Sequence, residues 1–186
     1  MKLLFLGEIG VGQTSLMRMR AFARMGHEVR GVNTIELWKQ ASWLQRRVQR
    51  KLQRGPVVDE INRAVLQAAR DFRPDIIWGE KQEYLRADTI RTLRAQGARL
   101  VHFTPDPYFS LYWKRTRLMD AAMGEFDMLV YCKRYEQAEY GSNGQSDSQV
   151  TKASDIPVGD CIVVILARCR PTTAVTQAGR RESDAE

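Results

Sequence analysis

The stretch KLLFLGEIGVGQTSLMRMRAFARMGHEVRGV, residues 2–32, decides the fold. It begins with a short apolar run, passes through a glycine-rich turn into a helical pattern that ends near Gly26, and starts a second run at Glu28. Apolar runs of this length are typical of strands in a parallel sheet that is buried on both faces. A strand, a helix and a second strand in this order predict one right-handed crossover unit.

The same alternation continues to about residue 140. Short apolar runs predict strands at residues 2–6, 28–32, 75–78, 100–104 and 128–132. Helical periodicity predicts helices at residues 15–25, 35–54, 57–72, 86–96 and roughly 109–123. Gly26 and Gly97 are expected to be left-handed caps after two of these helices. The sequence therefore predicts an α/β fold, a Rossmann-like doubly wound parallel sheet of five strands.

The chain changes character after Tyr140. Residues 141–186 contain no Phe, Trp or Tyr, and they hold 5 Lys+Arg against 6 Asp+Glu, whereas residues 1–140 hold 24 against 16. We expect one Rossmann-like domain over residues 1–140 and a poorly structured, linker-like tail over 141–186 that packs little against the sheet. The apolar run at 161–167 is an alternative sixth strand. The coincidence of these changes leads us to expect a truncated or frame-shifted reading frame.

Length and composition indicate a soluble globular protein with a single main domain. The chain has 186 residues, of which 44% are hydrophobic and 27% charged. The run at 161–167 is too short to cross a bilayer, and residues 1–6 read as a strand and not as a signal peptide, so we expect a cytoplasmic location. The net charge of +7 suits a phosphate-bearing ligand, anionic lipid or nucleic acid.

The cysteines do not indicate a metal or disulfide site. Cys132, Cys161 and Cys169 are odd in number and lack CxxC spacing. Cys132 is expected to be a buried strand residue. We expect no metal and no cofactor.

The loop GEIGVGQTS, residues 7–15, has the glycine spacing of a phosphate-binding P-loop, with Gly7, Gly12 and Thr14 in place. Gln13 stands where the lysine that contacts the β and γ phosphates would be, which disfavours a working P-loop. The dinucleotide pattern GxGxxG also fails, because Ser15 replaces its third glycine. Backbone N–H groups at the positive end of a helix remain a ready site for phosphate. The alternative is a tight turn capped by Thr14 or Ser15.

The order GEIGVGQTSLMRMRAFARMGHEVRGV resembles the opening of GT-B glycosyltransferases. The later pieces FRPDIIW, LRAQGARLVHFTPDPYF and FDMLVYCKRYEQAEY extend the resemblance to the glycosyltransferase family 4-like and spore-maturation (CgeB-like) branch, over nearly all of residues 1–140. The resemblance implies the acceptor-side half of an enzyme that transfers a sugar from a nucleotide-sugar donor to a hydroxyl acceptor. Such a half is expected to be inactive without the donor-binding domain.

Candidate site residues follow the predicted strands and the first loop. Asp106 is the main candidate for chemistry, because Pro105 and Pro107 fix its backbone and an inverting sugar transfer needs a carboxylate or imidazole that accepts the acceptor proton. The alternative is an aspartate that only shapes the turn. His102 is the second catalytic candidate, with a packed role as its alternative. The expected ligand-binding residues, with solvated loop charges as the alternative for the last two, are Gly10, Gly12, Thr14, Ser15, Glu80 and Lys81.

The segment WLQRRVQRKLQR, residues 43–54, is a basic amphipathic helix. Its cations are expected on one side and Trp43, Val48 and Leu52 on or near the other. Contact with the inner face of an anionic membrane and a solvated helix face are the two interpretations. The cations concerned are Arg46, Arg47, Arg50, Lys51 and Arg54. Nucleic acid is not expected, since alternating aromatic and basic residues for base stacking are absent.

Two further functional classes stay open at this point. One is a non-enzymatic Rossmann-like module that binds a phosphate ligand. The other is a nucleotide-dependent switch or ATPase, which rests only on the degenerate P-loop and would need a substitute for its lysine.

Overall fold

The computed structural model describes residues 1–110, 115–132 and 150–152. Within these residues a six-stranded parallel sheet has the order β2-β1-β3-β4-β5-β6. Its strands are β1 (Lys2–Gly7), β2 (Glu28–Asn33), β3 (Ile76–Glu80), β4 (Arg99–Thr104), β5 (Met128–Tyr131) and β6 (Val150–Lys152). The five expected strands are confirmed. The short strand β6 is an addition that the sequence did not predict.

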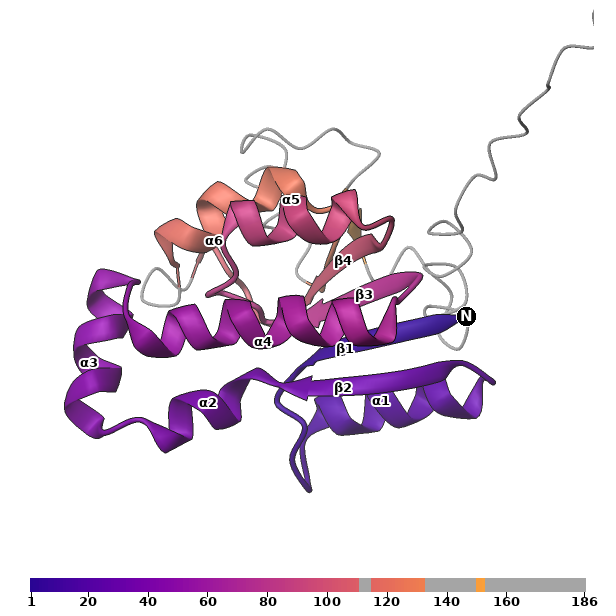
Figure 1. Cartoon of the computed structure of the whole chain (residues 1–186), viewed down its shortest axis with the longest axis horizontal. Coiled ribbons are helices and arrows are strands. Elements are labelled where there is room, and N and C mark those ends of the chain that lie inside the picture. Colours follow the sequence, from indigo (N-terminus) through magenta and orange to yellow (C-terminus); the bar gives the residue numbers. More distant parts are fainter. Residues whose placement is uncertain (111–114, 133–149, 153–186) are drawn as a thin grey trace, which may run out of the picture.

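Helices connect the strands and cover both faces of the sheet (Figure 1). Among the described residues they are α1 (Thr14–Arg24), α2 (Thr34–Gln40), α3 (Trp43–Leu52), α4 (Pro56–Phe72), α5 (Ala87–Ala95), α6 (Arg117–Ala122) and the 3-10 turn η1 (Met123–Glu125). Figure 1 shows α1 on one side of the sheet and α4 and α5 on the other. The α/β doubly wound fold is confirmed.

Strand side chains alternate between two apolar clusters. One cluster places Phe22 of α1 against Phe5, Trp78 and their neighbours on the same face. The other places Leu4, Leu6 and Ile77 against α4, α5 and α6. Period-two alternation in a sheet that is buried on both faces explains the continuous apolar runs of the sequence.

The prediction of one helix over residues 35–54 is wrong, because this segment forms two helices. Residues 41 and 42 interrupt it, and α3 restarts with a capping box at Ser42. The Ser42 hydroxyl accepts from the Gln45 amide at 3.3 Å, and the Gln45 side chain accepts from the Ser42 amide at 3.0 Å. This reciprocal pair satisfies two N–H groups that a helix start otherwise leaves without partners.

The helix predicted at 109–123 is shorter than expected. Residues 108–110 form a turn, and α6 begins at Arg117 because the Thr116 hydroxyl accepts from the Met119 amide at 3.1 Å. Gly26 and Gly97 have φ values of +82° and +92°, which confirms their left-handed conformation.

The tail is described only at residues 150–152. These pair with β5 in parallel register, so three residues of the tail that was expected to pack little against the sheet add a short strand to it. The remaining tail residues, including 161–167, Cys161 and Cys169, lie outside the described residues. Cys132 follows the end of β5 and is exposed, so its expected burial in a strand was wrong.

Candidate functional site

The strand order places a topological switch point between β1 and β3. The chain leaves β1 toward β2 on one side and later returns to β3 on the other, so the connections after β1 and β3 diverge at the carboxyl ends of these strands. A Cβ added to Gly7 would lie 3.0 Å from Phe5 Cε1 and 3.6 Å from Glu80 Cβ. The tight contact is with the Phe5 ring of the same strand, so glycine at this position leaves room for that ring, and the distance to Glu80 is an ordinary packing contact. Ligands of open α/β sheets bind at this position, the carboxyl ends of strands at a switch point.

The glycine loop crosses this edge and leads into α1. Gly12 has a φ of +84°, and the Gln13 amide donates to the Gly10 carbonyl at 3.1 Å. Gln13 is the N-cap residue of α1, but its side chain makes no capping hydrogen bond within the described structure. Capping by Thr14 or Ser15 is therefore not the arrangement found. Thr14 is exposed beside the first turn of α1, whereas Ser15 is buried behind the loop.

A buried ion pair joins α1 to the end of β3. Arg18 Nε donates to Glu80 Oε2 at 2.8 Å, and Arg18 Nη2 donates to Glu80 Oε1 and, at 3.2 Å, to the Thr14 hydroxyl. The guanidinium carbon lies 4.9 Å from the Phe103 ring centre. The Glu80 side chain is 1% exposed, against 26% for Arg18. The carboxylate of Glu80 is thus held by Arg18, and the cation is the partner that reaches the surface.

Arg18 is the residue that sequence reasoning missed. Its signal in the sequence is the spacing of four from Thr14, which places both side chains on one face of α1. Its pairing with Glu80 could not be predicted, because the two residues are 62 positions apart in the chain.

Lys81 and Asp106 form a second ion pair at the same edge. Lys81 Nζ lies 3.0 Å from Asp106 Oδ2, with side chains 45% and 37% exposed. Lys81 has a φ of +53°, and its amide donates to the Phe103 carbonyl at 3.1 Å. These contacts bring together the loops that follow β3 and β4. Two expected site residues are therefore adjacent and exposed at the carboxyl edge.

His102 points into the fold beneath this edge. Its Nε2 accepts from the Gln82 amide at 3.1 Å, and its ring centre lies 5.2 Å from that of Phe126. The residue is 2% exposed, and burial lowers the pKa of the imidazole to about 4. The Gln82 side chain in turn donates to the Glu80 carbonyl at 2.7 Å. His102 therefore fixes the loop that carries Lys81.

The buried His102 predicts an acid-sensitive fold. Its pKa of about 4 in the folded chain lies below the ordinary 6.5, so between these values the unfolded chain binds the extra proton. Stability is retained above pH 6.5 and lost as pH falls toward 4, by up to about 3 kcal/mol. Urea unfolding at pH 7 and pH 4.5 should show this loss. His102→Gln should remove most of it and His27→Gln should not. Equal pH dependence in both variants would contradict the assignment.

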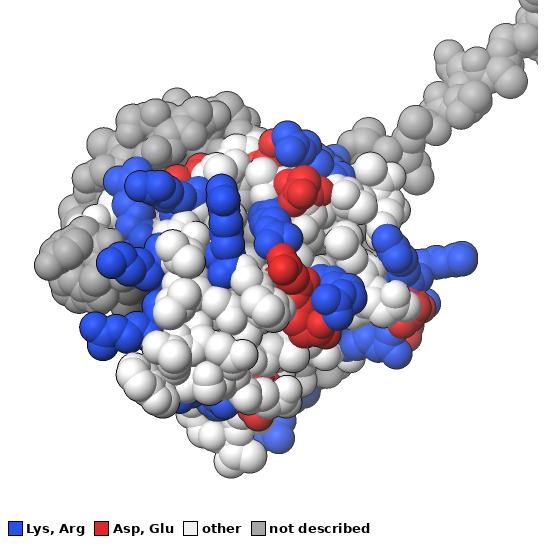
Figure 2. Space-filling model, turned by 60° about the vertical axis from the view of Figure 1, so that its left-hand side comes forward, with Lys and Arg blue, Asp and Glu red and all other residues white. Residues whose placement is uncertain are grey.

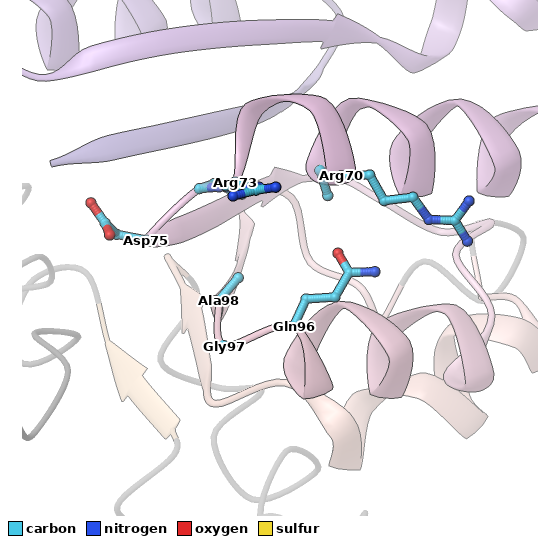
Figure 3. A pocket seen from close by; sticks show the side chains of 8 residues that line it. Arg70, Arg73, Asp75, Gln96, Gly97 and Ala98 are labelled. Atoms are coloured by element: carbon cyan, nitrogen blue, oxygen red, sulfur yellow. The ribbon is translucent and has the colours of Figure 1, made fainter. Parts of the chain in front are cut away.

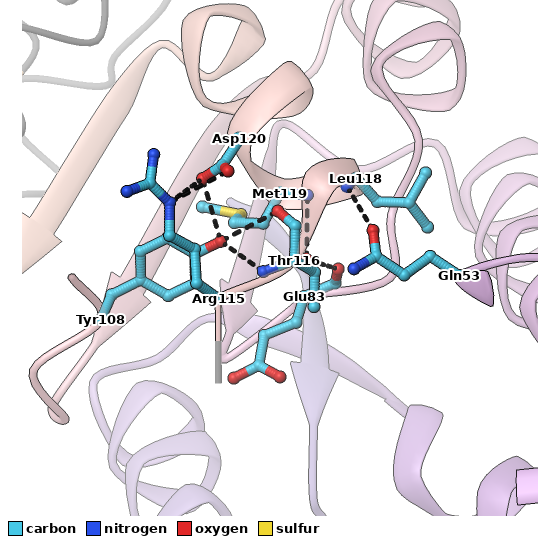
Figure 4. Close-up of polar contacts among 8 residues, drawn as sticks. All are labelled: Gln53, Glu83, Tyr108, Arg115, Thr116, Leu118, Met119 and Asp120. Atoms are coloured by element: carbon cyan, nitrogen blue, oxygen red, sulfur yellow. Dashed lines mark hydrogen bonds and ion pairs between the residues drawn. The ribbon is translucent and has the colours of Figure 1, made fainter. Parts of the chain in front are cut away.

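A hydrogen-bond network holds the segment that follows Asp106 (Figure 4). The Tyr108 hydroxyl accepts from the Thr116 amide at 3.0 Å and lies 3.1 Å from the Thr116 carbonyl. Burial raises the pKa of Tyr108. The Thr116 hydroxyl donates to the Glu83 carbonyl at 2.7 Å, and the Gln53 side chain accepts from the Leu118 amide at 3.1 Å. Tyr108 is thereby joined to Thr116, and residues 116–118 are tied to the loop after β3 and to the end of α3.

A small cavity of about 140 Å³ opens beside Lys81, between the ends of β2 and β3. Its apolar wall includes Trp38 and Tyr84, whose ring centres are 4.7 Å apart. Burial raises the pKa of Tyr84, so its hydroxyl keeps its proton. The other lining residues are Thr34, Ile35, Ile61, Gln82 and Glu83. The cavity therefore has apolar walls and a polar rim, and it lies next to the exposed ion pair of Lys81 and Asp106.

A larger pocket of about 590 Å³ lies at the opposite edge, where β3 and β4 begin (Figure 3). Arg70 and Arg73 border it, together with residues 96–98 at the end of α5. Asp75 there accepts from the Lys2 amide at 2.7 Å. Because ligands of open parallel sheets bind at the carboxyl ends of strands, this pocket is not the candidate site.

Neither a metal centre nor a membrane-spanning helix is found in the described part of the chain. No group of three His, Cys, Asp or Glu side chains is placed to hold a metal ion there. None of its helices has the length and apolar character needed to cross a bilayer.

Comparison with known proteins adds a fold likeness. No family model and no curated protein matches the chain. Among solved structures, UGT73P12 of Glycyrrhiza uralensis, in complex with glycyrrhetinic acid 3-O-monoglucuronide, is similar with a TM-score of 0.51 and 11% identity over 86% of this chain and 49% of that one. The glycosyltransferase SnogD from Streptomyces nogalater is similar with a TM-score of 0.43 and 17% identity over 82% of this chain and 44% of that one. The chain thus spans about half the length of these proteins. The likeness to UGT73P12 shows a shared fold.

Proposed function

We propose that this chain is the acceptor-side domain of a glycosyltransferase that moves a sugar from a nucleotide donor to a hydroxyl, in the family 4-like or CgeB-like branch. The observation that carries the proposal is the switch-point edge. An uncapped helix start follows β1 there, Arg18 pairs with Glu80 at the end of β3, and the exposed Lys81–Asp106 pair joins the loops after β3 and β4. The acceptor-side half of a GT-B enzyme needs an anion-binding helix start, a cation and a base at the cleft that faces its donor domain.

The loop and α1 would meet the phosphate or sugar side of the donor. Amide groups of the first helical turn and the helix dipole favour an anion. Arg18 adds a cation that Glu80 orients and Phe103 supports, one turn after the start of α1. Gly10, Gly12 and Thr14 line this approach, and Ser15 supports the loop from behind.

Asp106 would accept the proton of the acceptor hydroxyl. As the acceptor oxygen bonds to the anomeric carbon, the bond from that carbon to the nucleotide's phosphate oxygen breaks, and the nucleotide leaves with the electron pair. The ion pair with Lys81 positions the Asp106 carboxylate. This ion pair must weaken before Asp106 can accept the proton of the acceptor hydroxyl. Donor phosphate is a competing partner for Lys81, so donor binding would release the base.

The geometry favours Asp106 over His102 as the base. The His102 Nε2 already accepts from the Gln82 amide, and the ring is buried. A catalytic role for His102 would require the loop at 81–83 to move away. We therefore propose a positioning role for this residue.

Calorimetric titration tests the donor-side part of the proposal. The isolated chain should bind UDP-glucose weakly, with a Kd on the order of 1 mM, because the partner domain that grips the nucleotide is not supplied. It should not hydrolyse ATP. Gly12→Ala should abolish the weak binding, whereas Gly26→Ala should keep it, since the two glycines have φ values of +84° and +82° and nothing within 4 Å. Tight, magnesium-dependent ATP binding would instead establish the P-loop alternative.

A further inference from the structure

The α3 helix turns its apolar residues outward. Trp43, Leu44, Val48 and Leu52 are 67%, 56%, 45% and 62% exposed. Leu44, Val48 and Leu52 are spaced by four, so they form one stripe along the helix. Their exposure differs from the usual arrangement, in which the apolar face of a surface helix packs on the core. We call these three residues the α3 stripe.

Glutamines take the inward positions of the same helix. Gln49 is buried, and its side chain accepts from the Val57 amide at 2.9 Å. Gln53 follows the last residue of α3 and accepts from the Leu118 amide at 3.1 Å. These bonds fix the rotation of α3 on the domain. The outward direction of the α3 stripe is therefore set by the fold.

Cations lie on α3 beside the α3 stripe, and Arg54 and Arg117 lie near the C-terminal end of the helix. They border two hollows of about 690 and 560 Å³, and no ion pair links any of them to an acid within residues 1–110 and 115–132. Figure 2 shows Lys and Arg side chains gathered on this end of the molecule. The cations are Arg46, Arg47, Arg50, Lys51, Arg54 and Arg117.

We propose that α3 lies in the interface of an anionic lipid bilayer, with Trp43 and the α3 stripe among the acyl chains and the adjacent cations on the headgroups. An interfacial helix needs an apolar face, flanking cations and exposure of both, and α3 provides all three. A second copy of the chain would bring the same cations together, and their repulsion opposes it. Nucleic acid would use the cations but leave the apolar stripe without a partner.

The α3 helix lies next to the 140 Å³ cavity beside Lys81, which we take as the place for the acceptor of the proposed reaction. The Arg50 guanidinium carbon lies 5.6 Å from the Trp38 ring centre, and Trp38 lines the cavity with Tyr84. A hydroxyl that enters this cavity would therefore come from beside the bilayer. Resting on the proposed function, this placement indicates an acceptor carried by a lipid or held at the membrane surface.

Vesicle co-sedimentation of the full chain tests the proposal. The chain should bind vesicles of phosphatidylcholine with phosphatidylserine and should not bind vesicles of phosphatidylcholine alone. Val48→Glu with Leu52→Glu should weaken binding at least about tenfold, because two apolar contacts are lost and two charges oppose the lipid. Met17→Glu, an equal change at a residue 63% exposed on α1, should have no effect. Arg47→Glu with Lys51→Glu should also weaken binding about tenfold, whereas Arg24→Glu should not.

Three results would overturn the proposal. They are no binding of the unchanged chain to anionic vesicles, equal binding by the Val48→Glu, Leu52→Glu variant, or a dimer in solution that this variant dissociates. Circular dichroism shows whether each variant is folded, and these exposed positions should tolerate the changes. The assay needs no sugar transfer, so its failure leaves the proposed function standing, and failure of nucleotide binding leaves the membrane contact standing.

Discussion

Replacing Arg18 with alanine is expected to lower the free energy of unfolding by about 3 kcal/mol. The change leaves the Glu80 carboxylate buried without its cation, since that side chain is 1% exposed and receives two hydrogen bonds from Arg18. A buried charge without a partner costs far more than an exposed ion pair contributes. Glu80→Gln should cost less, because Arg18 is 26% exposed and can turn to water.

Urea unfolding followed by circular dichroism measures these differences. Arg20→Ala is the matched control, an exposed arginine on the same helix. The double variant Arg18→Ala, Glu80→Gln should lose less than the sum of the two single changes, because its second substitution removes the stranded charge. A loss for Arg18→Ala no larger than that for Arg20→Ala would show that the pair does not hold α1 on the sheet.

Phe22→Ala is expected to cost about 4 kcal/mol, because it opens a cavity between α1 and the sheet. The Phe22 ring is fully buried, with its centre 5.2 Å from that of Trp78 and 6.3 Å from that of Phe5. Together with Arg18 this side chain fixes the helix that carries the glycine loop.

The same unfolding experiment tests this prediction. Met17→Ala on the outer face of α1 is the control and should change stability by less than about 0.5 kcal/mol. A small effect of Phe22→Ala would mean that α1 packs elsewhere and that the loop is not positioned as described.

The regular part of the fold could be predicted because its signals are local. Each parallel strand is buried on both faces and reads as one apolar run, and Gly26 and Gly97 mark the ends of helices. The break between α2 and α3 at Ser42 also has a sequence signal, the Ser-x-x-Gln capping box. The helical periodicity continues on both sides of it, so the two helices were predicted as one. The strand at 150–152 could not be read, since three residues in a polar segment form no pattern.

The sequence predicted where the candidate site residues lie but not which of them form ion pairs and hydrogen bonds with one another. The sequence placed Asp106, Glu80 and Lys81 after their strands, and parallel strands bring those ends to one edge. Which groups pair there depends on side chains that are distant along the chain. Arg18 pairs with Glu80, and Lys81 pairs with Asp106. His102 of β4 is buried and accepts a hydrogen bond from the Gln82 amide.

Amide mapping by NMR shows whether the edge at the switch point of β1 and β3 faces the donor. In ¹⁵N–¹H correlation spectra, titration with UDP-glucose should shift the amides of Gly10, Gly12 and Thr14, and that of Lys81, before any others. The amides of residues 96–98, at the pocket on the opposite edge, should stay in place and serve as the internal control. Shifts concentrated at residues 96–98, or none at residues 10–14 at saturating ligand, would contradict the account.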